Sequence, residues 1–82
     1  MIMLEERIKK VLYCIRKRRV ELNYSQEYMA MRLKISQKGY SKIELNIVKL
    51  TADRLVDICE ILEIDVAEAL NCDEVKVFAM KA

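Results

Sequence analysis

The sequence predicts one small, all-α domain. It contains one glycine and no proline, the two residue types that most often interrupt helices. Hydrophobic residues make up 54% of its 82 residues, which favours a folded chain with a single core. Along much of the chain these residues recur three and four positions apart. A Ser, Thr or Asp precedes several of the segments, as at helix N-termini.

The first helix is expected from about residue 4 to residue 22. Its apolar stripe consists of Leu4, Ile8, Val11, Leu12, Ile15 and Leu22. Arg19 falls on the same stripe, where a charged group needs a partner because burial removes its hydration. The alternative is that the Arg19 head group extends past the stripe into solvent. Asn23 is then suited to end the helix in a left-handed conformation.

Residues 25–46 predict two short helices with a tight turn near Lys34 and Ile35. Ser25 and Ser36 are suited to cap them, because a Ser hydroxyl accepts hydrogen bonds from the unpaired amides of a first turn. The shared apolar stripe consists of Met29, Ala30, Leu33, Tyr40 and Ile43. The outer face of the second helix, which has no acidic group, consists of Gln37, Lys38, Ser41 and Lys42. Two capped helices in this arrangement are typical of a helix-turn-helix.

The chain beyond residue 50 predicts two further helices. Thr51 can cap a helix of about Ala52–Leu62, whose core stripe consists of Leu55, Ile58, Cys59 and Leu62. Asp65 begins a short fifth helix, with Glu68 placed to form a capping box. The residues expected to close the core there are Ala69 and Leu70. The side chains expected to anchor the preceding loop of residues 45–50 are Ile47, Val48 and Leu50.

Several parts of the central segment resemble the lambda-repressor-like (Cro/Xre) family of transcription regulators. They are Ser25-Gln26-Glu27, Met29-Ala30, Leu33-Lys34-Ile35-Ser36-Gln37 and Tyr40-Ser41-Lys42-Ile43-Glu44. The similarity extends from about residue 7 to residue 70. The chain departs from the family at Lys34, where the family usually has a glycine in a left-handed turn, and at Gly39 inside the second helix.

The resemblance implies a compact five-helix, lambda-repressor-like DNA-binding domain at residues 1–70, with a C-terminal extension at 71–82. In it the motif would be residues 25–46 and the recognition helix about 36–45. The residues expected to face bases in the major groove are Gln37, Lys38, Ser41 and Lys42. The residues expected to contact phosphates are Gln26, Ser36, Asn46 and Lys49. The resemblance also implies an ion pair between Arg19 and Glu44, and the small Gly39 would let the helix approach the groove closely.

The charges are unevenly distributed along the chain. Residues 1–50 contain twelve Lys and Arg against five Asp and Glu, whereas residues 51–82 contain three against eight. This asymmetry favours a basic face for a polyanion such as nucleic acid. The alternatives are that the two halves pair with each other or that the clustering is accidental. The basic run of residues 16–18 is either a solvated face or a further phosphate contact.

These features predict a sequence-specific, double-stranded DNA-binding regulator, a repressor acting as a homodimer on a palindromic operator. A dimer is expected because one such module buries only about 600–1,000 Å² on DNA. The alternative is an antitoxin or accessory module that binds another protein and contacts DNA secondarily. The apolar residues of the extension, Val75, Val77 and Phe78, would form the dimer or partner surface, or fold back on the domain.

Other classes are disfavoured by what the sequence lacks. There is no His, no glycine-rich phosphate loop and no close pair of Cys, so we expect neither an enzyme nor a metal or other cofactor. RNA binding is disfavoured by the absence of Trp and the single Phe. No membrane-spanning segment or signal peptide is apparent, and the odd number of cysteines favours reduced thiols in the cytoplasm.

Overall fold

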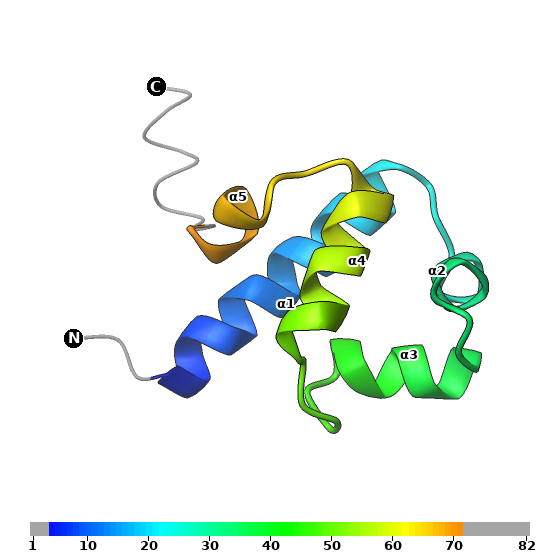
Figure 1. Cartoon of the computed structure of the whole chain (residues 1–82), viewed down its shortest axis with the longest axis horizontal. Helices are drawn as coiled ribbons and strands as arrows, with labels where there is room; N and C mark the ends of the chain where they lie inside the picture. Colours follow the sequence, from blue (N-terminus) through cyan, green and yellow to red (C-terminus); the bar gives the residue numbers. More distant parts are fainter. Residues whose placement is uncertain (1–3, 72–82) are drawn as a thin grey trace.

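The computed structural model describes residues 4–71, with side chains from residue 6 onward. Its helices are α1 (Leu4–Glu21), α2 (Gln26–Leu33), α3 (Gln37–Glu44), α4 (Ala52–Leu62) and α5 (Val66–Leu70). There is no strand in this part of the chain, so the all-α prediction is confirmed. Figure 1 shows α1 and α4 side by side in the middle of the molecule, with α5 at one end and α2 and α3 at the other.

Side-chain caps fix where three of the helices begin. Ser25 and Ser36 precede α2 and α3, and each hydroxyl accepts from the backbone amide three residues later, at 2.9 and 3.0 Å. Thr51 caps α4 in the same way at 3.2 Å. Because each cap satisfies an amide that has no partner within the helix, it stabilises the helix end by about 1 kcal/mol. All three caps were predicted from the sequence.

Four non-glycine residues adopt the left-handed conformation at the ends of helices or in the following turns. They are Asn23, Lys34, Asn46 and Glu63, with φ between 57° and 61°. Lys34 and Glu63 are the C-caps of α2 and α4, and each amide donates to carbonyls of the last helical turn. The turn between α2 and α3 therefore has the left-handed geometry that the family usually reaches with glycine.

We expect Lys34→Gly to raise the free energy of unfolding by up to about 1 kcal/mol, because glycine adopts φ 60° without steric strain. Glu63→Gly, at the matching cap of α4 with φ 57°, should have a similar effect. Urea denaturation of the two variants and the parent protein measures both changes. A loss of stability in both would show that these caps are not strained.

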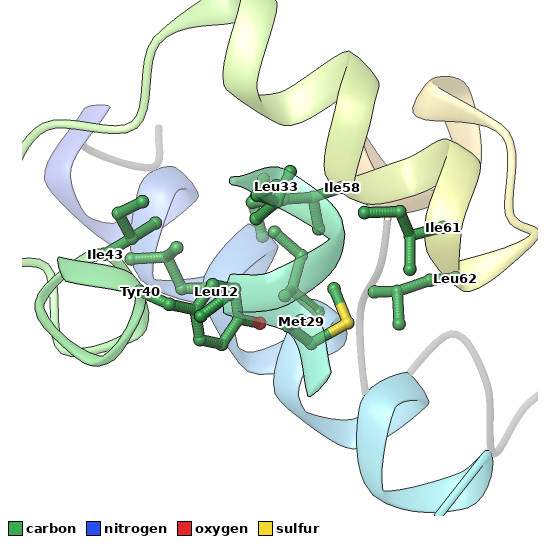
Figure 2. Packing of buried hydrophobic residues seen from close by; sticks show 11 residues of the cluster. Leu12, Met29, Leu33, Tyr40, Ile43, Ile58, Ile61 and Leu62 are labelled. Carbon is green, nitrogen blue, oxygen red and sulfur yellow. The ribbon is translucent and has the colours of Figure 1, made fainter. Parts of the chain in front are cut away.

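The core lies between α1, α2, α3 and α4. Figure 2 shows side chains from these helices converging, and the fully buried ones include Ile15, Met29, Tyr40, Ile58 and Leu62. The small Ala30 is 3% exposed and lies on α2, which packs closely against α3. Burying apolar area of this kind supplies most of the stabilisation of a small domain.

Two expectations about core residues were wrong. Ile47 and Val48 are 66% and 46% exposed and do not anchor the loop before α4, whereas Leu50 is half-buried against the core. The amides of Ile47 and Val48 both donate to the Lys42 carbonyl, at 2.9 and 3.2 Å, which turns the chain back against α3 and leaves their side chains outside. At α5, Ala69 is buried as expected, but Leu70 is 58% exposed.

The cysteines differ from one another. Cys59 is a free and buried thiol, as expected, but Cys14 is disulfide-bonded, so the expectation of a reduced thiol is wrong there. Cys72 and the apolar residues Val75, Val77 and Phe78 lie outside the described residues. Within residues 4–71, no helix is long and apolar enough to cross a membrane.

Candidate nucleic-acid interface

Helix α3 has one buried face and one free face. Within the described part of the chain, the helices that it contacts are α1 and α2, and it lies along an edge of the molecule away from α5 (Figure 1). Its inward residues, Tyr40 and Ile43, are 0% and 6% exposed. Its outward residues are Gln37, Lys38 and Lys42, which are exposed, and Ser41, which is half-buried. The four base-facing candidates therefore share one accessible helix face.

This outer face carries positive charge and no negative charge. The single acidic residue of α3 is Glu44, whose side chain is only 3% exposed because it points inward. Among residues 4–71, neither Lys38 nor Lys42 forms an ion pair. The N-terminal end of α3 adds the partial positive charge of a helix dipole. The combination suits contact with a polyanion.

Gly39 lies in the first turn of α3 and contributes no side chain to this face. Its amide donates to the Ser36 hydroxyl at 3.0 Å. A β-carbon at this position would lie 3.1 Å from the same oxygen, which is tighter than most such contacts. A larger residue would therefore crowd the cap of α3, and glycine also leaves room for a close approach of the helix backbone.

On the inner side, Arg19 of α1 holds the end of α3. Its Nε and Nη2 atoms donate to the two oxygens of Glu44 at 2.7 and 3.2 Å, which is the two-point geometry of a strong Arg–carboxylate pair. Nη1 donates to the Tyr24 carbonyl at 2.9 Å. The Arg19 side chain is 12% exposed, so its head group does not extend into solvent. The pair fixes α3 relative to α1.

Two further donors complete the surroundings of the Glu44 carboxylate. Gln26, in the first turn of α2, donates from Nε2 to Oε1 at 3.2 Å, and the Tyr40 hydroxyl donates to Oε2. One carboxylate therefore accepts hydrogen bonds from α1, α2 and α3. Because each buried polar group in this cluster has a partner, the cluster stabilises one orientation of α3 rather than several.

Sequence reasoning assigned neither Tyr40 nor Gln26 to this cluster. Tyr40 and Glu44 are four residues apart on one helix, and this spacing could have indicated the hydroxyl contact. The Gln26 contact joins residues 18 positions apart on different helices, so no local pattern indicates it. With Nε2 bound to Glu44, Gln26 still has a second amide hydrogen and a carbonyl oxygen for other contacts.

The buried cluster shifts two pKa values upward. The hydrogen bond to Glu44 raises the pKa of Arg19 by more than burial lowers it, so the guanidinium stays charged. Burial of the hydroxyl, followed by its hydrogen bond to Glu44, raises the pKa of Tyr40 well above its ordinary value. Because the pKa of Tyr40 is higher in the folded chain than in the unfolded chain, the stability that depends on its neutral hydroxyl is fully present below the unfolded pKa of about 10. This stability is lost as the pH rises above that value.

We therefore expect the parent protein to lose stability above about pH 10, and Tyr40→Phe to lose less over the same interval. Urea denaturation between about pH 8 and about pH 11 measures the difference. Burial also raises the pKa of the Cys59 thiol, but this group is present in both proteins and cancels in the comparison. Parallel stability curves for the two proteins would contradict the role of the Tyr40 hydroxyl.

The four phosphate candidates differ in their surroundings. Ser36 is exposed and its hydroxyl caps α3, whereas Gln26 is half-buried and bound to Glu44. Asn46 and Lys49 are exposed in the loop that follows α3. Figure 1 shows this loop at the edge of the molecule that α3 occupies. In the basic run of α1, Arg18 donates to the Leu62 carbonyl at 3.0 Å, and its two preceding neighbours are exposed.

Helices α2 and α3, joined by a tight left-handed turn and presenting a cationic outer face, define a DNA-binding helix-turn-helix. A family model described as helix-turn-helix matches residues 15–69, which is more than half of the chain. The chain belongs to this family, of the Cro/Xre type, whose members are DNA-binding regulators and generally not enzymes. No curated protein and no solved structure matches the chain.

Proposed function

We propose that the protein is a cytoplasmic, sequence-specific transcriptional repressor that binds a palindromic operator as a homodimer, with α3 in the major groove. The observation that supports this most directly is the outer face of α3. This face is accessible and cationic. The inner face is held by the Glu44 cluster, which consists of Glu44 and its hydrogen-bond donors Arg19, Gln26 and Tyr40. A helix with one firmly held side and one free polar side can enter a groove without rearrangement.

The first turn of α3 would read base edges most directly, because recognition helices contact bases with their N-terminal residues. Gln37 suits adenine, whose N6 and N7 match an amide, and Lys38 suits guanine, whose O6 and N7 accept hydrogen bonds. Ser41 and Lys42 lie one turn further along the same face. Each well-formed pair would discriminate against a wrong base by about 1–3 kcal/mol.

The phosphate contacts would supply most of the affinity and no sequence preference. Gln26 and Ser36 are placed at the N-terminal ends of α2 and α3, where the helix dipoles favour an anion. Asn46 and Lys49 would contact the backbone beside the C-terminal end of α3. Binding should therefore weaken strongly with added salt.

The size of the domain supports the proposed homodimer. One module of this kind buries only about 600–1,000 Å² on DNA, which is small for a specific complex. Two copies on half-sites about 34 Å apart would double the contacts, and a palindrome has the symmetry of such a pair. A domain that covers an operator acts most simply by blocking access to that DNA, so we propose repression rather than activation.

Selection of bound fragments from random duplex DNA, followed by titration of the selected sequence and of random duplex, tests the proposal. We expect an enriched motif with two-fold symmetry, bound at least 1,000-fold (~10³) more tightly than random DNA at physiological salt. Binding without an enriched motif would contradict a sequence-specific regulator. An enriched but asymmetric motif bound by one copy would contradict the homodimer alone.

A further inference from the structure

A hollow in the surface lies between α2 and α4, two helices that pack against each other. Its volume is about 320 Å³, and we refer to it as the α2–α4 hollow. Small-molecule sites in proteins have volumes of about 300–1,000 Å³, so this hollow suits a small ligand. The residues that line it are Arg32, Leu33, Lys34, Asp57, Glu60 and Ile61. None of the six belongs to the base-facing or phosphate-facing sets proposed above.

The two sides of the α2–α4 hollow carry opposite charges. Arg32 and Lys34, at the C-terminal end of α2, provide two cations. Asp57 and Glu60 lie three residues apart on α4 and provide two carboxylates. All four residues are exposed, and within residues 4–71 no ion pair joins these cations to these carboxylates. The hollow therefore presents both kinds of charge across one gap.

The cationic side is held in place by contacts within and just after α2. The Nη1 atom of Arg32 donates to the Tyr28 hydroxyl at 2.6 Å, and its guanidinium carbon lies 5.6 Å from the centre of the Tyr28 ring. A guanidinium has five N–H donors, so Arg32 keeps others for a ligand. The backbone of Lys34 is fixed by its left-handed cap, whose amide donates to the Ala30 and Met31 carbonyls. Groups held in this way lose little freedom when a ligand binds.

The α2–α4 hollow also has an apolar component. Leu33 from α2 and Ile61 from α4 both line it, and each is 8% exposed. These side chains belong to the core, so the apolar surface that they contribute is fixed by the packing of the two helices. An aliphatic group placed against them would leave water, which favours binding.

The arrangement of charges selects the class of ligand. An anion drawn to Arg32 and Lys34 would be repelled by the two carboxylates, and a cation drawn to the carboxylates would be repelled by the two basic groups. A ligand that carries both charges gains on both sides. The geometry points to the α2–α4 hollow as a binding site for a small zwitterion with an aliphatic body, the class of the free aliphatic α-amino acids.

In this complex the carboxylate of the amino acid faces the basic side and its ammonium group faces Asp57 and Glu60. Charge-assisted hydrogen bonds form at both ends, and the aliphatic side chain packs against Leu33 and Ile61. Because Lys34 lies in the turn between α2 and α3, the ligand contacts both the helix-turn-helix and α4. The outer face of α3 stays free, so the amino acid and DNA can bind together. The inference goes beyond the proposed function and does not depend on it.

The test is an NMR titration of the nitrogen-15-labelled protein with L-leucine, without DNA and at low salt, because exposed charges are screened as salt is added. Two leucine analogues with one charge each are titrated in parallel: 3-methylbutylamine lacks the carboxylate, and 4-methylpentanoate lacks the ammonium group. We expect leucine to shift the amides of residues 32–34 and 57–61 with a Kd of about 1 mM. Each analogue should bind at least tenfold (~10) more weakly.

Arg32→Gln and Asp57→Asn remove one charge from each side of the α2–α4 hollow and should each weaken leucine binding about tenfold. Asp53→Asn is the matched control, because Asp53 is exposed on α4 one turn earlier and does not line the hollow. It should leave the Kd unchanged. The spectrum of each variant without ligand shows whether its fold persists.

Each outcome decides the inference. Saturable changes at the lining residues that are weaker for both analogues, and weaker in both hollow variants, would support it. Equal affinity for leucine and either analogue would contradict a site for a zwitterion, and this comparison needs only the parent protein. Changes confined to other parts of the chain, or no saturable change with leucine, would contradict the α2–α4 hollow as the site.

Discussion

Glu44→Ala is expected to lower the free energy of unfolding by about 3 kcal/mol, the lower end of what breaking a buried ion pair costs. The substitution leaves the Arg19 guanidinium, 12% exposed, without its carboxylate partner. It also removes the acceptor for Gln26 and the Tyr40 hydroxyl. The melting temperature of a domain of this size should fall by about 12–24 °C, since each kcal/mol corresponds to about 4–8 °C.

Thermal denaturation followed by circular dichroism measures this change, and Glu21→Ala is the matched control. Glu21 also pairs with an arginine of α1, but at 4.0 Å and with a side chain that is 54% exposed. Exposed pairs contribute at most about 1 kcal/mol and often nothing measurable, so the control should leave stability nearly unchanged. Similar melting temperatures for both variants would show that the Glu44 cluster does not stabilise α3.

Gln37→Ala and Lys42→Ala are each expected to lower affinity for the preferred DNA sequence by about 5-fold to 150-fold, the range of 1–3 kcal/mol. Affinity for random duplex should change little, because phosphate contacts supply most of it. Both side chains are exposed on α3, so the folded structure should persist. Fluorescence-anisotropy titrations with the two duplexes at one fixed salt concentration measure the ratio.

Lys9→Ala provides the control for loss of one positive charge. Lys9 is exposed on α1 and outside the proposed interface, so its removal should leave the ratio of the two affinities unchanged. If Gln37→Ala and Lys42→Ala weaken both duplexes equally, the side chains contact phosphates and not bases. If they weaken neither, α3 is not the recognition helix.

The sequence predicted the parts of the fold that follow a regular period or a local cap. Ser25, Ser36 and Thr51 cap their helices, and the inward and outward sides of α3 divide as the helical spacing indicated. The family resemblance suggested the partner of Arg19, which the structure places in contact with Glu44 at 2.7 Å. Each of these features depends on residue types at fixed separations.

The remaining features depend on contacts that no local pattern encodes. Ile47 and Val48 look like anchors because they are apolar, but a loop has no period that separates its inner from its outer side. Their exposure depends on the Lys42 carbonyl, which accepts from both of their amides. Likewise, Gln26 contacts Glu44 only because α2 crosses α3 at that point, and that crossing results from packing of the whole core.

An NMR titration of the nitrogen-15-labelled protein with the selected duplex tests most directly whether α3 enters the groove. The largest changes in amide chemical shift are expected in residues 36–42, with further changes at the N-terminal turn of α2 and in residues 45–49. Helix α5, at the other end of the molecule, should change little (Figure 1). Changes concentrated on α4 and α5, with those of α3 unaffected, would contradict the assignment of α3 as the DNA-reading helix.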